Sequence, residues 1–147
     1  MLTTVLPPPL GEYAVESQAG HLLRRAHQRH TALFQDAMAG FELTPTQFTA
    51  LVKIVELGRV TQNHLGRLAA MDPATIQGVV RRLVARGLAS TAADPLDRRT
   101  VVLTATSEGR ALAATAVPVA KKITVATLAP LNEREQRLFL TLITKLA

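Results

Sequence analysis

Apolar and polar positions along this chain follow two different periods. Over most of the 147 residues, apolar side chains recur every three or four positions, as on the buried face of an amphipathic helix. Segments 88–91 and 100–104 are short, β-branched and apolar and predict strands, and Val60-Thr61 could form a third, very short strand. The pattern predicts a mainly α fold with a two- to three-stranded β element and six helices, over residues 15–40, 44–58, 62–70, 72–87, 105–128 and 131–147.

Capping motifs mark the ends of several predicted helices. Thr44-Pro45-Thr46-Gln47 combines a capping threonine, a proline at the first helical position and a glutamine that completes a capping box. Gly40, Gly58 and Gly87 are placed to end the helices that precede them. Pro118 falls inside the fifth predicted helix and should kink or loosen it locally.

The helix over residues 72–87 has two contrasting faces. Asp72 can cap its first turn, and Gly87 supplies a left-handed residue at its end. One face is an apolar stripe of Ile76, Val79, Val80, Leu83 and Val84. The other face is small, then basic, and lacks acid after Asp72: Ala74, Thr75, Gln77, Gly78, Arg81, Arg82 and Ala85. A DNA major groove admits one such helix; an ordinary helix with a solvated basic face is the alternative.

The preceding segment favours the DNA interpretation. A short helix over 62–70, capped by Thr61, buries Leu65, Leu68 and Ala69 in the expected pattern. A tight turn then leads into the basic helix. Two short helices in this order, the second with an outward basic face, predict a helix-turn-helix.

The following segment predicts a protruding hairpin. The two strands enclose the polar loop 92–99, which is too long for a two-residue turn. The Arg98-Arg99 pair would project from its tip. Paired cations on a ribbon suit a narrow minor groove, where the potential is most negative. A solvated hairpin tip is the alternative.

Composition limits the possible function classes. The formal net charge is +6, from 17 basic and 11 acidic residues, which makes nucleic acid the leading partner and an anionic membrane surface the second. The absence of cysteine excludes disulfides, thiolate metal sites and a thiol-based sensor. No apolar run approaches the roughly 20 residues that span a bilayer, and no signal peptide is evident. We therefore expect a cytoplasmic protein without a membrane partner.

The chain ends predict self-association. Residues 1–14 contain Pro7-Pro8-Pro9 and should form a flexible arm. The helices over 15–40 and 105–147 carry more apolar surface than a small module over 41–104 needs for its own cover. Such a surplus predicts a two-fold dimer in which the termini interlock. We expect no enzyme and no cofactor, because paired carboxylates, a Ser-His-Asp arrangement and a phosphate loop are all absent.

In combination, these segments resemble the MarR family of bacterial transcription regulators. The resemblance rests on the order of elements and on three stretches of sequence. These are Leu43-Thr44-Pro45-Thr46-Gln47-Phe48, Arg82-Leu83-Val84-Ala85-Arg86-Gly87-Leu88, and Asp94-Pro95-Leu96-Asp97-Arg98-Arg99 with the following Val102-Leu103-Thr104 and Glu108-Gly109. It covers about residues 15–147.

The resemblance implies a winged helix-turn-helix over residues 41–104 and a helical dimerisation region over 15–40 and 105–147. It implies a homodimeric repressor that occupies a pseudo-palindromic operator and leaves it when a small molecule binds. Asp97 would anchor the wing loop while Arg99, with Arg98 beside it, contacts DNA. The sequence departs from the family pattern at Gln77-Gly78, where many relatives carry bulkier polar residues. The operator sequence therefore cannot be copied from a relative. The alternative is a winged helix for protein–protein contact, which predicts a neutral or acidic recognition face.

Individual residues can be assigned to parts of a DNA site. Base edges would be contacted by Thr75, Gln77 and Arg81, since arginine pairs with guanine and glutamine with adenine. Phosphates would be contacted by Thr61 and Gln62 at a helix start. Arg82 and Arg86 are phosphate contacts or internal ion pairs, and Gly78, beside the small Ala74 on the same face, permits close backbone approach; the alternative for Gly78 is a tolerated helix glycine.

The effector hypothesis rests on the first helix. In the family the pocket lies where the first, second and fifth helices meet the winged module. Polar side chains there could hold a carboxylate and nearby phenylalanines could line the apolar part: His21, Arg24, His27, His30, Phe34, Phe41 and Phe48. This predicts an aromatic or N-heteroaromatic carboxylate, such as a hydroxynicotinate or hydroxycinnamate derivative. The alternatives are polar residues of a dimer interface, a different effector or none; zinc bound by the histidines is a lesser option.

Overall fold

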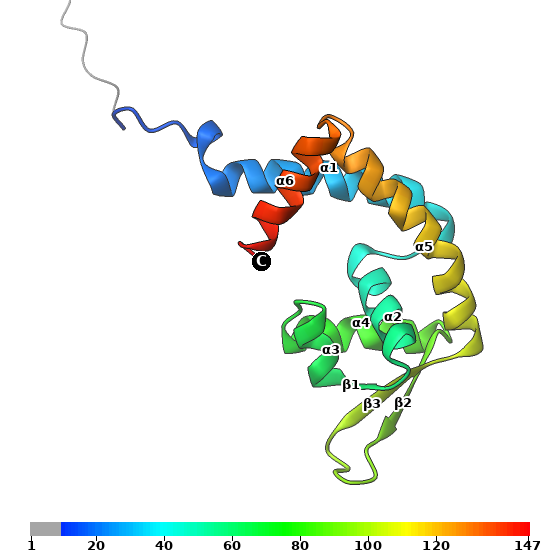
Figure 1. The fold of residues 1–147 in the computed structure, drawn as a ribbon. Helices are drawn as coiled ribbons and strands as arrows, with labels where there is room; N and C mark the ends of the chain where they lie inside the picture. Colours follow the sequence, from blue (N-terminus) through cyan, green and yellow to red (C-terminus); the bar gives the residue numbers. More distant parts are fainter. Residues whose placement is uncertain (1–9) are drawn as a thin grey trace, which may run out of the picture.

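The computed structural model describes residues 10–147, so most of the predicted N-terminal arm, residues 1–9, lies outside them. Within the described residues, six α-helices and three strands follow one another in the predicted order (Figure 1). Their bounds are α1 (Ala19–Met38), α2 (Pro45–Leu57), β1 (Val60–Thr61), α3 (Gln62–Leu68), α4 (Pro73–Ala85), β2 (Ala89–Ala93), β3 (Val101–Ala105), α5 (Ser107–Leu128) and α6 (Glu133–Thr144). Single 3-10 turns, η1 (Val15–Ser17) and η2 (Ala39–Phe41), flank α1. The predicted fold class is confirmed.

The three strands form one antiparallel sheet with β3 in the middle, in the order β1-β3-β2. Val60 of β1 lies opposite Leu103, and Ala89 of β2 lies opposite Ala105. The two residues of β1 tie the loop after α2 to the hairpin. Figure 1 shows the β2–β3 hairpin extending away from the helices, as expected of a wing.

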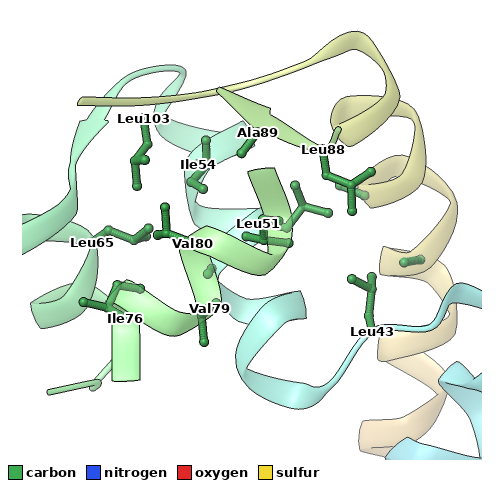
Figure 2. Close-up of a cluster of buried hydrophobic side chains, with 14 of the residues drawn as sticks. Leu43, Leu51, Ile54, Leu65, Ile76, Val79, Val80, Leu88, Ala89 and Leu103 are labelled. Carbon is green, nitrogen blue, oxygen red and sulfur yellow. The ribbon is translucent and has the colours of Figure 1, made fainter. Parts of the chain in front are cut away.

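An aliphatic core holds α2, α3 and α4 against this sheet. Leu51, Ile54, Leu65 and Leu103 are completely buried and converge in the close-up of Figure 2. Removing such a side chain from water stabilises the fold by about 1.5–3 kcal/mol. The stripe on α4 enters the same cluster through Ile76, Val79, Val80 and Leu83. Because this face of α4 is fixed in the core, its opposite face must point outward.

The terminal helices are arranged differently. α1 packs along α5, and α5 also packs on α2, while α6 turns back across α1 (Figure 1). α6 begins with the capping box of Asn132 and Glu135, yet none of its residues is buried. Leu138 and Leu142 are both at least half exposed. An amphipathic helix whose apolar face is uncovered lacks a packing partner in a single chain.

A tight backbone junction joins α5 to the end of α4. Gly87 has a φ of +72°, as predicted for the residue that ends α4. The Thr106 hydroxyl donates to the Gly87 carbonyl over 2.6 Å, and the Thr106 N–H donates to the Leu88 carbonyl over 3.1 Å. Gly109, in the first turn of α5, lies so close to Leu88 that a Cβ would overlap the Leu88 carbonyl oxygen.

The prediction that Gly40 ends the first helix is wrong. The helix runs on into η2, and Glu42 adopts the left-handed conformation with a φ of 53°. Arg86 explains the difference, because its guanidinium donates to the carbonyls of Phe41 and Glu42 over 3.0 and 2.6 Å. The helix also begins later than predicted, at Ala19, because η1 and Gln18 precede it.

Two side chains predicted to be buried are exposed. Leu68 is 44% exposed because α3 ends there after only seven residues and covers the core with one face. Val84 is 36% exposed because it borders a surface hollow beside β2. Both residues follow the helical period, but the neighbouring elements do not reach them.

The prediction that no apolar segment approaches membrane length also needs correction. In the described residues one helix, α5, is long and apolar enough by length and composition, and it continues through Pro118. α5 packs along α1 and α2 with Ala113, Ala116 and Ile123 buried. Since core helices pass the same test, this helix alone is weak evidence for a membrane span.

Candidate nucleic-acid interface and effector groove

The first turn of α4 is fixed by its cap. An Asp72 carboxylate oxygen accepts the Thr75 N–H over 2.8 Å, and the other accepts the Thr75 hydroxyl over 2.9 Å. These bonds, the backbone one first, lower the pKa of Asp72 below its ordinary value. Because the Thr75 hydroxyl donates its hydrogen to Asp72, it can act toward a base edge only as an acceptor.

The outward face of α4 carries the residues that the sequence assigned to bases. Thr75, Gln77 and Arg81 are exposed, as are Ala74 and Arg82, and Gly78 is half-buried with open space beside its Cα. An added Cβ at Gly78 would meet no atom within 4 Å. A flat, open backbone at this position allows another molecule to approach α4 closely.

A shallow hollow of about 250 Å³ brings three elements together on this face. Gln62 comes from α3, Gln77 and Arg81 from α4, and Thr91 from β2, with Val80 and Val84 completing the lining. Thr91 was not singled out by the sequence, because an exposed threonine in a strand carries no local signal. The hollow shows that the outward face of α4 adjoins the start of α3 and the β2 strand of the wing.

The start of α3 is also capped by a side chain. The Thr61 hydroxyl oxygen accepts the His64 N–H over 3.2 Å, so part of its hydrogen-bonding capacity is used within the helix. Thr61 and Gln62 are both half-buried. They remain at the surface beside α4, where the sequence predicted phosphate contacts.

The wing loop is organised by two aspartates. Asp97 accepts the Arg99 N–H over 3.1 Å and the Thr100 hydroxyl over 3.3 Å, which closes the turn. Asp94 at the base lies 3.8 Å from the Arg59 guanidinium. The Arg99 side chain is 97% exposed and its Nε lies 3.8 Å from Asp97, and Arg98 is exposed as well. The turn therefore presents two cations to solvent.

The two arginines near the end of α4 differ in role. Arg86 is engaged with the carbonyls of Phe41 and Glu42, so it acts inside the protein rather than at a phosphate. Its partners are backbone carbonyls, which the helical period of α4 cannot reveal. Arg82 lies one helical turn earlier and is exposed.

An apolar groove of about 810 Å³ lies between α1, α5 and α6. Of the residues predicted for an effector site, His27 and His30 line it. The remainder of the lining is Ala19, Leu22, Leu23, Ala26, Thr124, Thr127, Leu128, Phe139, Leu140, Ile143 and Leu146. The two histidines and two threonines are thus the polar residues in an otherwise apolar lining.

The other predicted effector residues do not line this groove. His21 is half-buried and Arg24 is exposed on other parts of α1. Phe34 is buried and its ring packs edge-on against Phe48, with centroids 5.9 Å apart, while Phe41 packs partly buried on the same core. These phenylalanines pack in the core where α1 meets α2, and the Phe34 ring centroid lies 6.4 Å from that of His30.

A chain of hydrogen bonds connects His30 of α1 to α5. The Thr127 hydroxyl donates to the Ile123 carbonyl over 2.8 Å. The same oxygen lies 2.9 Å from His30 Nδ1, and the direction of that hydrogen bond depends on the tautomer of the ring. Thr127 was missed by the sequence because its partner lies 97 residues earlier.

The histidines do not form a metal cluster. Among residues 10–147, no group of three or more His, Cys, Asp or Glu side chains is positioned to hold a metal ion. The His27 ring lies 3.4 Å from the Thr31 hydroxyl on the same helix. Neighbouring threonines, rather than carboxylates, are the partners of both histidines in the groove.

Comparison with known proteins yields consistent matches. A model of the MarR family matches residues 41–100. The HTH-type transcriptional repressor NicR of Pseudomonas putida is 40% identical over 146 residues, covering 98% of this chain and 92% of that protein. A probable transcriptional regulator from Pseudomonas aeruginosa has 44% identity and a TM-score of 0.88, covering 91% of this chain and 100% of that chain. Bordetella bronchiseptica BpsR, whose DNA binding is regulated by 6-hydroxynicotinic acid, has 41% identity and a TM-score of 0.88, covering 92% and 97%.

Proposed function

Because this chain belongs to the MarR family of transcriptional regulators, we propose that it is a homodimeric repressor with α4 of each subunit in a major groove of a pseudo-palindromic operator. The observation that carries this proposal is the orientation of α4. Its apolar stripe is held in the core, and its outward face shares a hollow with α3 and with β2 of the wing. Polar and basic side chains from three elements are thereby available to one duplex.

The homodimer is supported by the terminal helices. α6 has no buried residue, and its Leu138 and Leu142, which lie outside the groove, are at least half exposed. An exposed apolar surface of this kind belongs in an interface. We accordingly divide the chain into a DNA-binding region, 41–104, and a dimerisation region, 15–40 and 105–147.

Salt dependence tests the DNA contacts residue by residue. Binding is measured by fluorescence anisotropy on the upstream DNA that the protein protects from nuclease cleavage, and on unrelated DNA. Arg99→Ala should weaken binding to both and reduce the salt slope by about one per subunit. Arg81→Ala should reduce the difference in affinity between the upstream DNA and the unrelated DNA. A lost bidentate contact to a base is worth about 1–3 kcal/mol of discrimination.

Two results would contradict these assignments. An unchanged salt slope for Arg99→Ala would remove the wing from the DNA contact. An equal loss on both DNAs for Arg81→Ala would make Arg81 a phosphate contact. Failure of the wild-type protein to bind its upstream DNA at low salt would favour a protein-binding module instead.

For the effector, we propose an aromatic or N-heteroaromatic carboxylate of the hydroxynicotinate type, which releases the operator. BpsR, regulated by 6-hydroxynicotinic acid, supports the ligand class. Among the described residues that line the groove, only His27 and His30 have side chains able to carry positive charge. A ring N–H of His30 could donate a hydrogen bond to the carboxylate, while the apolar lining would contact the aromatic ring of the ligand.

Ligand-induced stabilisation tests this proposal. 6-Hydroxynicotinate at 100 times its Kd should stabilise the protein by about 2.7 kcal/mol and release the DNA. His30→Leu should abolish both effects, and Arg24→Ala is the matched control because Arg24 lies outside the groove. No shift with 6-hydroxynicotinate or with hydroxycinnamates would reject the ligand class. A change in sedimentation mass for His30→Leu would place His30 in the subunit interface.

A further inference from the structure

The tip of the wing carries an exposed leucine. Leu96 is 96% exposed, more than any other large apolar side chain in residues 10–147. It lies between Pro95 and Asp97, within a loop that is otherwise polar. A fully solvated leucine is unfavourable compared with one in contact with apolar surface. Its presence at a protruding tip indicates a partner that covers it.

The loop holds this leucine outward. The Leu96 N–H donates to Asp94 Oδ1 over 3.0 Å, and the Asp97 N–H donates to the Asp94 carbonyl over 3.2 Å. On the other side, the Thr100 N–H donates to the Asp97 carbonyl over 2.9 Å. These bonds fix the backbone on both sides of Leu96 and therefore the direction of its Cα–Cβ bond.

The charges around Leu96 identify the chemistry of its partner. Arg98 and Arg99 follow it within three residues, and the Arg99 side chain is almost fully exposed. A partner must therefore offer negative charge and apolar surface a few ångströms apart. The minor groove of DNA does so, because its phosphates stand above walls formed by the carbon atoms of the deoxyriboses, and proteins commonly place apolar side chains there.

We propose that Leu96 packs against the deoxyribose walls of the same minor groove that Arg98 and Arg99 enter. The inference rests on the proposed placement of the wing beside DNA. Leu96 adds affinity that does not depend on counterion release, in contrast to the arginines. It contributes most where the groove is narrow, because both walls then reach the side chain.

Salt titrations distinguish this contact from an electrostatic one. Leu96→Ala should weaken binding to the nuclease-protected upstream DNA about tenfold, equivalent to about 1.4 kcal/mol, at every salt concentration and with an unchanged slope. Leu96→Asn, of similar size but polar, should lose as much, and Leu96→Met should stay within about twofold of the wild type. The melting temperature should not change, since Leu96 makes no buried contact.

The results separate this inference from the proposed function. If Arg99→Ala lowers the salt slope but Leu96→Ala binds like the wild type, the leucine contact is wrong and the wing placement stands. If neither variant changes binding, the wing placement itself is wrong. A changed slope or a changed sedimentation mass for Leu96→Ala would also overturn the inference, the first indicating a collapsed turn and the second a protein partner.

Discussion

The winged module and the terminal helices use apolar residues in opposite ways. In the module, Leu51, Ile54 and Leu65 are completely buried by neighbours from the same chain. In α6, Leu138 is 55% and Leu142 50% exposed, although the helix is well capped. The winged module therefore buries its apolar residues within one chain, whereas the terminal helices leave apolar residues exposed, which agrees with the proposed dimer.

The junction between the two regions should be the most sensitive position. Gly109→Val would force a side chain into the Leu88 carbonyl, and backbone atoms cannot move aside cheaply. We expect a loss of about 3 kcal/mol or more in the free energy of unfolding, measured by urea denaturation. Gly78→Ala is the control, because a Cβ added there meets no atom within 4 Å and a helical alanine should add about 1 kcal/mol.

If Gly109→Val were as stable as the wild type, α5 would not be anchored at Leu88. Gly78→Ala carries a second expectation, because its new methyl group would face the DNA. It should raise stability and weaken operator binding at the same time.

A charge on the exposed apolar face of α6 should dissociate the dimer without unfolding the winged module. Leu142→Glu places a carboxylate on a surface that we assign to the partner subunit, and an unpaired charge is costly to bury there. We expect half the wild-type mass in sedimentation, with the circular dichroism of the winged module retained. Retention of the dimer would mean that Leu142 stays solvated and the interface lies elsewhere.

A second sensitive position is Arg86, at the edge of the winged module where the chain enters from α1. It ties the end of α4 to the loop between α1 and α2 through two carbonyls. Arg86→Ala should cost about 1 kcal/mol in the free energy of unfolding, because two charge-assisted hydrogen bonds at the surface are lost. Arg82→Ala, the matched control on the same helix, should stay within about 0.5 kcal/mol. Equal effects would mean that the Arg86 contacts contribute nothing.

The smallest effect should come from the cap of α4. The folded-state pKa of Asp72 lies below its ordinary value of 3.8, so its contribution is complete above that value and is lost as the pH falls through the folded pKa. Asp72→Asn keeps a capping oxygen but removes the titration. Unfolding curves from pH 6 down to about pH 2 should show a slightly shallower decline for the variant; identical curves would contradict the lowered pKa.

Local signals predicted much of this fold. The capping box of Thr44 and Gln47 and the left-handed Gly87 depend on residues close in sequence, and the structure confirms both. Glu42 takes the role predicted for Gly40 because Arg86, more than 40 residues away, binds the loop. Long-range contacts of this kind leave no periodic trace in the sequence.

The candidate sites also combine residues that the sequence could predict with residues that only the tertiary structure brings together. The outward residues of α4 follow from the helical period once its buried stripe is known, and they are exposed as predicted. The effector residues were grouped by residue type along α1; in the structure His30 lines the groove, and Phe34, whose ring centroid lies 6.4 Å from that of His30, is buried in the core. Thr127 and Thr91 reach their sites only through tertiary structure.

The contact of Gly109 with Leu88 makes α5 a lever with a fixed base. Its 22 residues extend about 33 Å from the winged module to the groove between α1, α5 and α6. A tilt of about 10° at one end of such a rod displaces the other by about 6 Å, more than one base-pair step of about 3.4 Å. A molecule bound between α1, α5 and α6 would need to change the angle of α5 by only a few degrees. The α4 helices of the two subunits would then no longer match the spacing of the major grooves.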